Sequence, residues 1–183
     1  GLHCPNVSPT QTLSPSPSAT PIIIDCSVSQ GTPAGVLTLA ASATSVHDPA
    51  ITASASINIT VPADRVNGQP RLVIEVTGSA ENHLPHEGSL VLNVLLRNDG
   101  NEQLSGTLAL VGEGAADLSP GWISSGGSSS PTYMLGPGEQ ASYELTLVSS
   151  YLTSGGEQSM RVQAAGSGHQ VLSDSFTINV SSK

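Results

Sequence analysis

Hydrophobic residues alternate with polar ones along much of the chain, and this two-residue period is typical of β-strands that bury one face. The clearest case is the stretch 89–97, which places Leu90, Leu92, Val94 and Leu96 on one face. Comparable patterns, separated by turn-forming residues, predict strands in the C-terminal part of the chain at residues 71–77, 89–97, 103–111, 142–149, 158–165 and 171–180.

Two connections between these strands lead to predictions of their own. Residues 98–101 read Asn-Asp-Gly-Asn, a turn signal, so the strand 103–111 is expected to pair with the strand before the turn. Residues 112–130 are rich in Gly and Ser and are predicted to form a loop around Trp122, the single tryptophan.

The N-terminal part contains a tract rich in Pro, Ser and Thr at residues 5–21. A tract of this composition cannot form a helix. We expect an irregular loop that is tied back to a sheet; an O-glycosylated spacer is the alternative. Residues 63–70 interrupt the strand pattern and are predicted to be a linker. Strands are predicted between these two segments at residues 22–28, 35–43 and 51–61.

The strands that end at Val61 resemble the last strands of the chain in pattern and spacing, which indicates an internal repeat. The predicted organisation is a partial or strand-complemented module at 1–62, a linker at 63–70 and a complete β-sandwich at 71–183. Half a sandwich exposes an apolar face and unpaired strand edges. Three explanations are open: the chain is a fragment of a longer repeat protein, a strand donated by a neighbouring subunit completes the half-module, or the N-terminal tract itself supplies the missing strands.

Composition narrows the fold class and the partners. Aromatic residues make up 3% of the chain and charged residues 10%, so an all-β fold is expected and helix is not a major element. A net charge of −9, with the few arginines scattered, argues against a nucleic-acid partner. No apolar run approaches the roughly 20 residues of a transmembrane helix. The chain is therefore expected to be a mature or excised protein with no membrane span.

The two cysteines, Cys4 and Cys26, flank the Pro-rich tract. Their spacing is too long for a redox or zinc C-x-x-C pair. A disulfide is the favoured interpretation; it would stabilise the fold by about 3 kcal/mol in the chain-entropy model and would imply an oxidising compartment. Two buried reduced thiols and a metal site are the alternatives.

Asn6, Asn58 and Asn179 each begin an Asn-x-Ser/Thr triplet and are candidate N-glycosylation sites. In residues 57–61 and 176–180 the hydrophobic residues alternate with polar ones, which turns Asn58 and Asn179 toward solvent. Glycans are thus expected if the host cell can attach them.

Two clusters contain metal-ligating side chains, but neither predicts a metal site. His83, His86 and Glu87 match no standard ligand spacing and are interpreted as part of an exposed loop. The acidic residues within 99–102 lack the rhythm of a calcium-binding loop, and a hairpin turn explains them. No metal or cofactor is therefore expected.

The sequence contains no recognisable catalytic motif. A Gly-x-Ser-x-Gly elbow is missing and the acidic residues are dispersed, so we do not expect an enzyme. Trp122 and Tyr133 are a candidate sugar-stacking platform, although a lone tryptophan in a sandwich more often packs in the core or in a loop. The histidines are all predicted to lie in loops: His3, His47, His83, His86 and His169.

Residues 72–180 resemble the immunoglobulin-like repeats of prokaryotic surface proteins in the CARDB, NEW3 and DUF11 group. The resemblance rests on the strand that ends in the Asn-Asp-Gly-Asn turn, on Trp122, on the Leu-Gly-Pro-Gly-Glu segment at 135–139 and on the closing strand 176–180. It implies an immunoglobulin-like β-sandwich and display at a surface rather than catalysis.

The expected function is that of a structural repeat in an extracellular or cell-surface protein, such as a sheath, surface layer or filament. Its expected partners are neighbouring immunoglobulin-like modules or identical subunits. A filament subunit assembled by β-strand exchange is one alternative. A non-catalytic carbohydrate- or protein-binding accessory domain of a secreted enzyme is the other.

Overall fold

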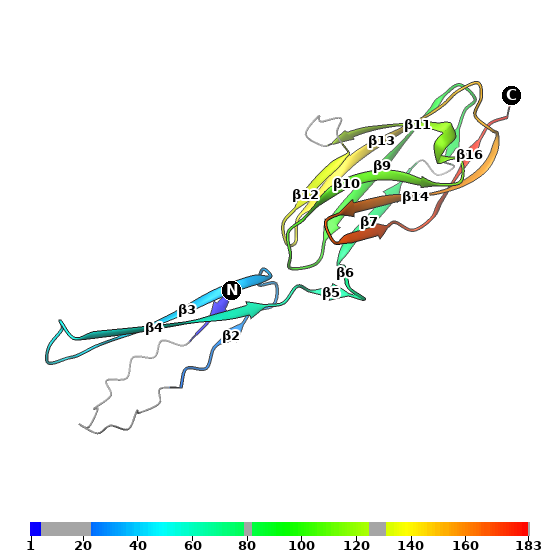
Figure 1. The fold of residues 1–183 in the computed structure, drawn as a ribbon. Coiled ribbons are helices and arrows are strands. Elements are labelled where there is room, and N and C mark those ends of the chain that lie inside the picture. The colour runs from blue at the N-terminus through cyan, green and yellow to red at the C-terminus, as the bar shows by residue number, and fades with distance from the viewer. Residues whose placement is uncertain (5–22, 79–81, 125–130, 183) are drawn as a thin grey trace. The chain divides into compact units, whose positions relative to one another are not determined.

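The computed structural model describes residues 1–4, 23–78, 82–124 and 131–182 (Figure 1). The chain divides into two compact units, Gly1–Pro62 and Ala63–Lys183. Among the described residues the regular elements are β-strands, with one short 3-10 helix. The Pro-, Ser- and Thr-rich tract at 5–21, together with Asn6, lies outside the described residues.

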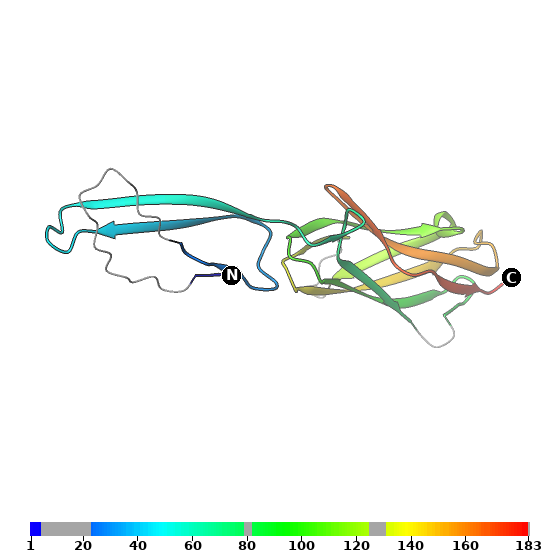
Figure 2. The same ribbon diagram turned by 90° about the horizontal axis from the view of Figure 1, so that it is seen from below.

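The second unit contains two extended β-sheets, which face one another as a sandwich (Figure 2). The first sheet has the order β11-β13-β9-β7, formed by Leu118–Ser124, Gln140–Ser149, Ser89–Asn98 and Leu72–Thr77. The second sheet has the order β12-β10-β14-β16-β8, formed by Thr132–Leu135, Leu104–Gly112, Gly156–Gly166, Phe176–Val180 and His83–Leu84. A further strand, β15 (His169–Leu172), pairs with β14.

The order of these strands defines the fold class. In chain order β7, β9, β11 and β13 take the places of strands A, B, D and E of a constant-type immunoglobulin sandwich, while β10, β14 and β16 take those of C, F and G. The neighbours in both sheets are antiparallel, except that β16 and β8 pair in parallel. The second unit is therefore a complete immunoglobulin-like β-sandwich.

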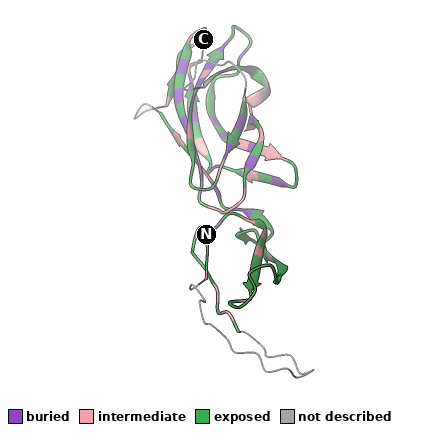
Figure 3. Cartoon of the chain, turned by 90° about the vertical axis from the view of Figure 1, so that its left-hand side faces the viewer, coloured by how far each residue is buried: buried purple, intermediate pink, exposed green. Residues whose placement is uncertain are grey.

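The core lies between the two sheets and follows the predicted alternation. The positions of β9 that were predicted to share a face, from Leu90 to Leu96, are all buried. In register with them on β13, Leu145 lies opposite Leu92 and Leu147 lies opposite Leu90. Figure 3 shows buried positions alternating with exposed ones along the sandwich strands. The facing sheet contributes Leu108, Met160, Val162, Ala164, Ile178 and Val180.

The pairing predicted across the turn at 98–101 is wrong. The strand that follows the turn, β10, lies in the other sheet, between β12 and β14. Both edges of β9 are already occupied by β7 and β13, so β9 has no edge left for β10. The turn therefore carries the chain from one layer of the sandwich to the other.

The predicted loop at 112–130 is partly regular. It contains the 3-10 helix η1 (Ala115–Asp117) and strand β11, which pairs with β13 and carries the buried Trp122. Residues 125–130 lie outside the described residues. The edge strand β11 was not predicted from the sequence, because hydrophobic and polar residues alternate only weakly in it and the surrounding residues are rich in Gly and Ser.

The predicted strand 171–180 is divided into β15 and β16. The division occurs at Ser173, which is buried. Its backbone N–H donates to the Val162 carbonyl oxygen at 2.8 Å, and its hydroxyl oxygen accepts from the Val162 N–H at 2.9 Å. The Ser173 hydroxyl thus takes the place of a backbone carbonyl as the acceptor for the Val162 N–H. Because the backbone ladder is interrupted here, the chain continues as a separate strand.

Residues 63–70, predicted to be a linker, form part of the second unit. Strands β5 (Arg65–Val66) and β6 (Gln69–Pro70) pair as a hairpin. Asn67 and Gly68 have positive φ angles of 51° and 79°, which a two-residue type I′ turn requires. The Arg65 guanidinium donates to both carboxylate oxygens of Glu102, at 2.8 and 2.7 Å, and fastens this hairpin to the sandwich.

The first unit contains two separate pairs of strands among its described residues. In its described residues β1 (Leu2–His3) pairs with β2 (Ser27–Val28), and β3 (Gly35–Thr44) pairs with β4 (Thr52–Val61). The predicted strand 22–28 is therefore reduced to Ser27–Val28. The adjacent Ile23 and Ile24 do not alternate with polar residues, so they define no single face, and Ile23 is exposed.

Candidate functional site

The pair of strands β3 and β4, here called the ribbon, has two chemically different faces. The strands are in register over their whole length, from Gly35 opposite Val61 to Thr44 opposite Thr52. The polar face carries mainly Ser, Thr and Asn. The apolar face carries Leu37, Leu39, Ala41, Ala43, Ala53, Ala55, Ile57, Ile59 and Val61.

Much of this apolar face is exposed, and Figure 3 shows mainly exposed residues along the ribbon. Ile57 is 61% exposed, and Leu37, Leu39 and Ile59 are only half-buried. At one end of this face Val61 is buried, whereas toward the other end Ala41, Ala43, Ala53 and Ala55 are exposed. A contiguous exposed apolar face of this kind is typical of an interaction surface.

The edges of the ribbon also indicate an interaction surface. Among the described residues β3 and β4 pair only with each other, so each strand has one outer edge that belongs to no sheet. Soluble proteins normally protect such edges with charged residues, prolines or bulges. Residues 35–44 and 52–61 contain no charged residue and no proline. The ribbon is therefore suited to pairing with another β-structure.

Only part of the apolar face of the ribbon could be predicted from the sequence. The alternation in 57–61 was visible because Ile and Val contrast strongly with Asn and Thr. Farther along the ribbon, Ala alternates with Ser and Thr, and these residues differ too little in hydrophobicity to define a face. The register between β3 and β4 was needed to bring the two apolar rows together.

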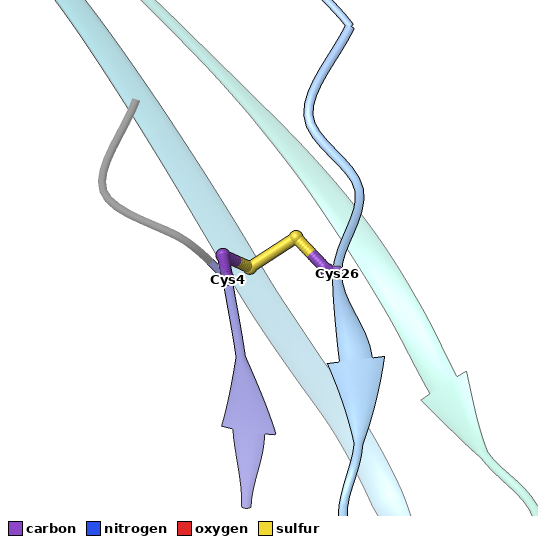
Figure 4. The surroundings of a disulfide bond; sticks show 2 residues. All are labelled: Cys4 and Cys26. Atoms are coloured by element: carbon purple, nitrogen blue, oxygen red, sulfur yellow. A yellow bond between two sulfur atoms is a disulfide. The ribbon is translucent and has the colours of Figure 1, made fainter. Parts of the chain in front are cut away.

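Cys4 and Cys26 are joined by a disulfide next to the short β1–β2 pair (Figure 4). Their Cα atoms are 4.3 Å apart and 22 positions apart in sequence. The Ser29 N–H donates to the Gly1 carbonyl oxygen at 3.0 Å, which extends the same pairing. A disulfide that closes a loop of this length stabilises the folded state by about 3 kcal/mol in the chain-entropy model.

Replacement of both Cys4 and Cys26 by Ser is expected to open the β1–β2 pair without changing the unfolding of the sandwich. The pair spans two residues per strand, so it depends on the covalent link. Hydrogen exchange followed by mass spectrometry would resolve the two units, with peptides of the sandwich as the internal control. Unchanged protection around Ser27 in the variant would contradict the prediction.

The aromatic pair predicted as a sugar-stacking platform is buried. Trp122 and Tyr133 are 8% and 4% exposed and lie on different sheets. The Tyr133 hydroxyl lies 2.5 Å from Nε2 of His169, which is a buried strand residue and not a loop residue. Gly106 and Gly166 face each other beside this pair, and a Cβ atom on Gly166 would lie 2.5 Å from the His169 ring.

Burial raises the pKa of Tyr133 to about 12, so the phenol keeps its proton at a pH that ionises an exposed tyrosine. The hydroxyl of Tyr143 donates to the Thr132 carbonyl oxygen at 2.9 Å, and burial also raises the pKa of Tyr143. Both phenols thus serve as hydrogen-bonding groups of the core.

The two clusters that contain metal-ligating side chains were not expected to bind a metal, and their side chains make other contacts. His83 lies on β8, with Nε2 3.1 Å from the Ser181 hydroxyl, whereas the His86 ring packs against Tyr151. In the part of the chain that the structure describes, no group of three or more His, Cys, Asp or Glu residues could hold a metal ion.

The acidic residues after β9 are paired with arginines instead. The Arg97 guanidinium donates to Asp99 at 2.7 Å, and this hydrogen bond lowers the pKa of the Asp99 carboxyl below its usual value. Glu102 accepts the two hydrogen bonds from Arg65. No described helix is long and apolar enough to cross a membrane.

Comparisons with known proteins leave the function open. No family model matches the chain, and no curated protein matches it. One similar solved structure is a family 123 glycoside hydrolase from Clostridium perfringens, with 7% identity, a TM-score of 0.43, and 61% of this chain and 27% of that chain covered. Another is domains 4 and 5 of the S-layer protein SbsC, with 18% identity, a TM-score of 0.37, and 72% and 63% covered. This chain spans less than two thirds of either of those chains.

Proposed function

We propose that the chain is a structural module of an extracellular or cell-surface protein, and that the ribbon joins it to another β-structure. The immunoglobulin-like sandwich supplies a self-contained body with a closed core. The disulfide between Cys4 and Cys26 supports an oxidising location outside the cytoplasm. The resemblance to repeats of the CARDB, NEW3 and DUF11 group supports the same role.

The observation that carries this proposal is the open apolar face of the ribbon. An isolated two-stranded sheet is marginally stable in water, and a third strand or a second layer is normally needed. Burial of one large aliphatic side chain stabilises a complex by about 1.5–3 kcal/mol. Ile57 therefore offers much of this gain when a partner covers it, and Leu37, Leu39 and Ile59, which are already half-buried, each offer a smaller part. This gain is the driving force for joining.

A second candidate, a filament subunit assembled by strand exchange, is favoured by the two unprotected edges. An edge strand can accept a strand from another chain through backbone hydrogen bonds. If the donor and acceptor surfaces differ, the contact repeats and produces an open filament; if they are the same, a closed dimer results. A carbohydrate-binding accessory role has less support, because Trp122 and Tyr133 are buried.

The test uses two neighbouring residues of β3 that lie on opposite faces and are both exposed, Ala41 and Ser42. We expect the wild-type chain to associate with increasing concentration. Ala41→Lys places a charge on the apolar face and is expected to weaken association at least 10-fold, a change of about 1.4 kcal/mol. Ser42→Lys adds the same charge to the polar face and is expected to leave association unchanged.

Sedimentation equilibrium would give the association constants, and negative-stain electron microscopy would separate dimers from filaments. A wild-type chain that remains monomeric at all concentrations would contradict pairing between copies. An equal loss in both variants would show that charge on β3, rather than the apolar face, controls association.

A further inference from the structure

Asn58 lies in the middle of the polar face of the ribbon. The alternation along β4 turns Asn58 and Thr60 to this face and Ile59 to the apolar face. Both Asn58 and Thr60 are exposed. The Thr38 hydroxyl donates to the Asn58 carbonyl oxygen Oδ1 at 3.0 Å, whereas an N-linked sugar is attached through the amide nitrogen.

The surroundings of Asn58 leave room for a bulky group. Its partner across the ribbon is Thr38, and the next pairs on the same face are Val36 with Thr60 and Ala40 with Ser56. These side chains are small and uncharged. A branched sugar attached to Asn58 would extend into solvent without displacing any part of the ribbon.

Asn179 occupies an equivalent position on the sandwich. Its neighbours along β16, Ile178 and Val180, are 0% and 2% exposed and point into the core, so the Asn179 side chain is on the outer face. Its backbone N–H donates to the Asn82 carbonyl oxygen at 3.0 Å. Strand pairing thus uses the backbone of Asn179 and turns the side chain to solvent. Ser181, two residues on, supplies the hydroxyl of the triplet.

We propose that Asn58 and Asn179 carry N-linked oligosaccharides, so that the polar face of the ribbon and the outer face of the β16 sheet are covered by sugar. The inference rests on the extracellular location proposed above. The co-substrate is an oligosaccharide linked through phosphate to a membrane lipid. The amide nitrogen forms a bond to C1 of the first sugar and loses one proton, while the bond from C1 to the phosphate oxygen breaks and the lipid phosphate leaves with the electron pair.

This modification assigns separate roles to the two faces of the ribbon. The sugar keeps the polar face hydrated and excludes it from protein contacts. The apolar face, on the opposite side of the same two strands, stays accessible to a partner. On the sandwich, sugar at Asn179 similarly excludes protein partners from the outer surface of β16.

The first test is glycopeptide mass spectrometry of the full chain secreted by cells that perform N-glycosylation. Both asparagines are expected to carry sugar. Thr60→Ala is expected to abolish modification of Asn58 and Thr60→Ser to retain it; Ser181→Ala and Ser181→Thr are the matched pair for Asn179. Asn93 is exposed but begins no triplet, and it is expected to stay unmodified.

Secreted, disulfide-bonded protein in which Asn58 or Asn179 is unmodified would overturn the assignment of that site and leave the proposed function standing. Protein recovered only inside the cell with reduced cysteines would contradict both the location and the modification. The two failures are therefore distinguishable.

The second test asks whether the two faces of the ribbon have separate roles, by introducing a new Asn-x-Ser/Thr triplet on each face. Ser42→Asn creates one with Thr44 on the polar face, and Ala43→Asn creates one with Ser45 on the apolar face. Sugar at position 42 is expected to leave self-association unchanged, and sugar at position 43 to weaken it at least 10-fold. Equal association of the two glycosylated variants would overturn the assignment of separate roles to the faces.

Discussion

Truncation of Leu145 to Ala is expected to destabilise the sandwich by about 3 kcal/mol, because it leaves a cavity that the rigid sheets cannot close. Leu145 is fully buried near the middle of β13. In register it lies between Leu92 of β9 and Trp122 of β11, which are also buried. The lost contacts therefore come from a continuous row across three strands of this sheet, β11, β13 and β9.

Denaturant unfolding monitored by tryptophan fluorescence would measure this change, since Trp122 borders the cavity. Glu144→Ala is the matched control, because Glu144 is the adjacent residue on β13 and is exposed. Its effect is expected to stay within about 0.5 kcal/mol. A loss below about 1 kcal/mol for Leu145→Ala would show that the two sheets pack less tightly around Leu145 than its complete burial indicates.

Replacement of Asn98 by Ala is expected to lower the free energy of unfolding by about 3 kcal/mol, since it leaves one buried and three partly buried backbone groups without this partner. Asn98 is fully buried at the end of β9. Its amide nitrogen donates to the carbonyl oxygens of Glu102, Gly136 and Leu135 at 2.7, 3.0 and 3.3 Å. Its side-chain oxygen accepts from the Gly100 N–H at 3.1 Å.

These hydrogen bonds join two segments. One is residues 98–102, where the chain crosses from one sheet to the other, and the other is residues 135–136, which precede β13. Asn98→Ala is therefore expected to loosen both segments as well as to lower the free energy of unfolding. Asn93→Ala, at an exposed position on the same strand, is the control and is expected to be near neutral. Hydrogen exchange of residues 98–102 would report the local effect. Unchanged exchange there would contradict this role of Asn98.

Strand positions were predictable wherever aliphatic residues alternate strongly with polar ones. The strands at 35–43, 51–61 and 89–97 correspond to β3, β4 and β9 with small shifts at their ends. Prediction failed where the contrast is weak, as in β11, and where a side chain interrupts a ladder, as at Ser173. In both places the deciding interactions come from strands that are distant in sequence.

The hairpin at 65–70 shows a different limit. Its Asn67-Gly68 turn is a strong local hairpin signal, but Pro62 and Pro70 interrupt the strand pattern and suggested a linker. Contacts with distant residues hold the short hairpin against the sandwich: Arg65 pairs with Glu102, and the Gln170 N–H donates to the Gln69 side-chain oxygen at 3.2 Å. Arg65 and Glu102 are 37 positions apart, and no local sequence pattern indicates that they are in contact.

The sequence by itself determined the all-β character of the protein, the positions of most core residues and the outward direction of Asn58 and Asn179. These properties follow from the two-residue period of a strand, which is local. Only the tertiary structure decided which strands share a sheet and that the apolar rows of β3 and β4 lie on one open face. Sheet order and register depend on contacts between distant segments, and no local pattern specifies them.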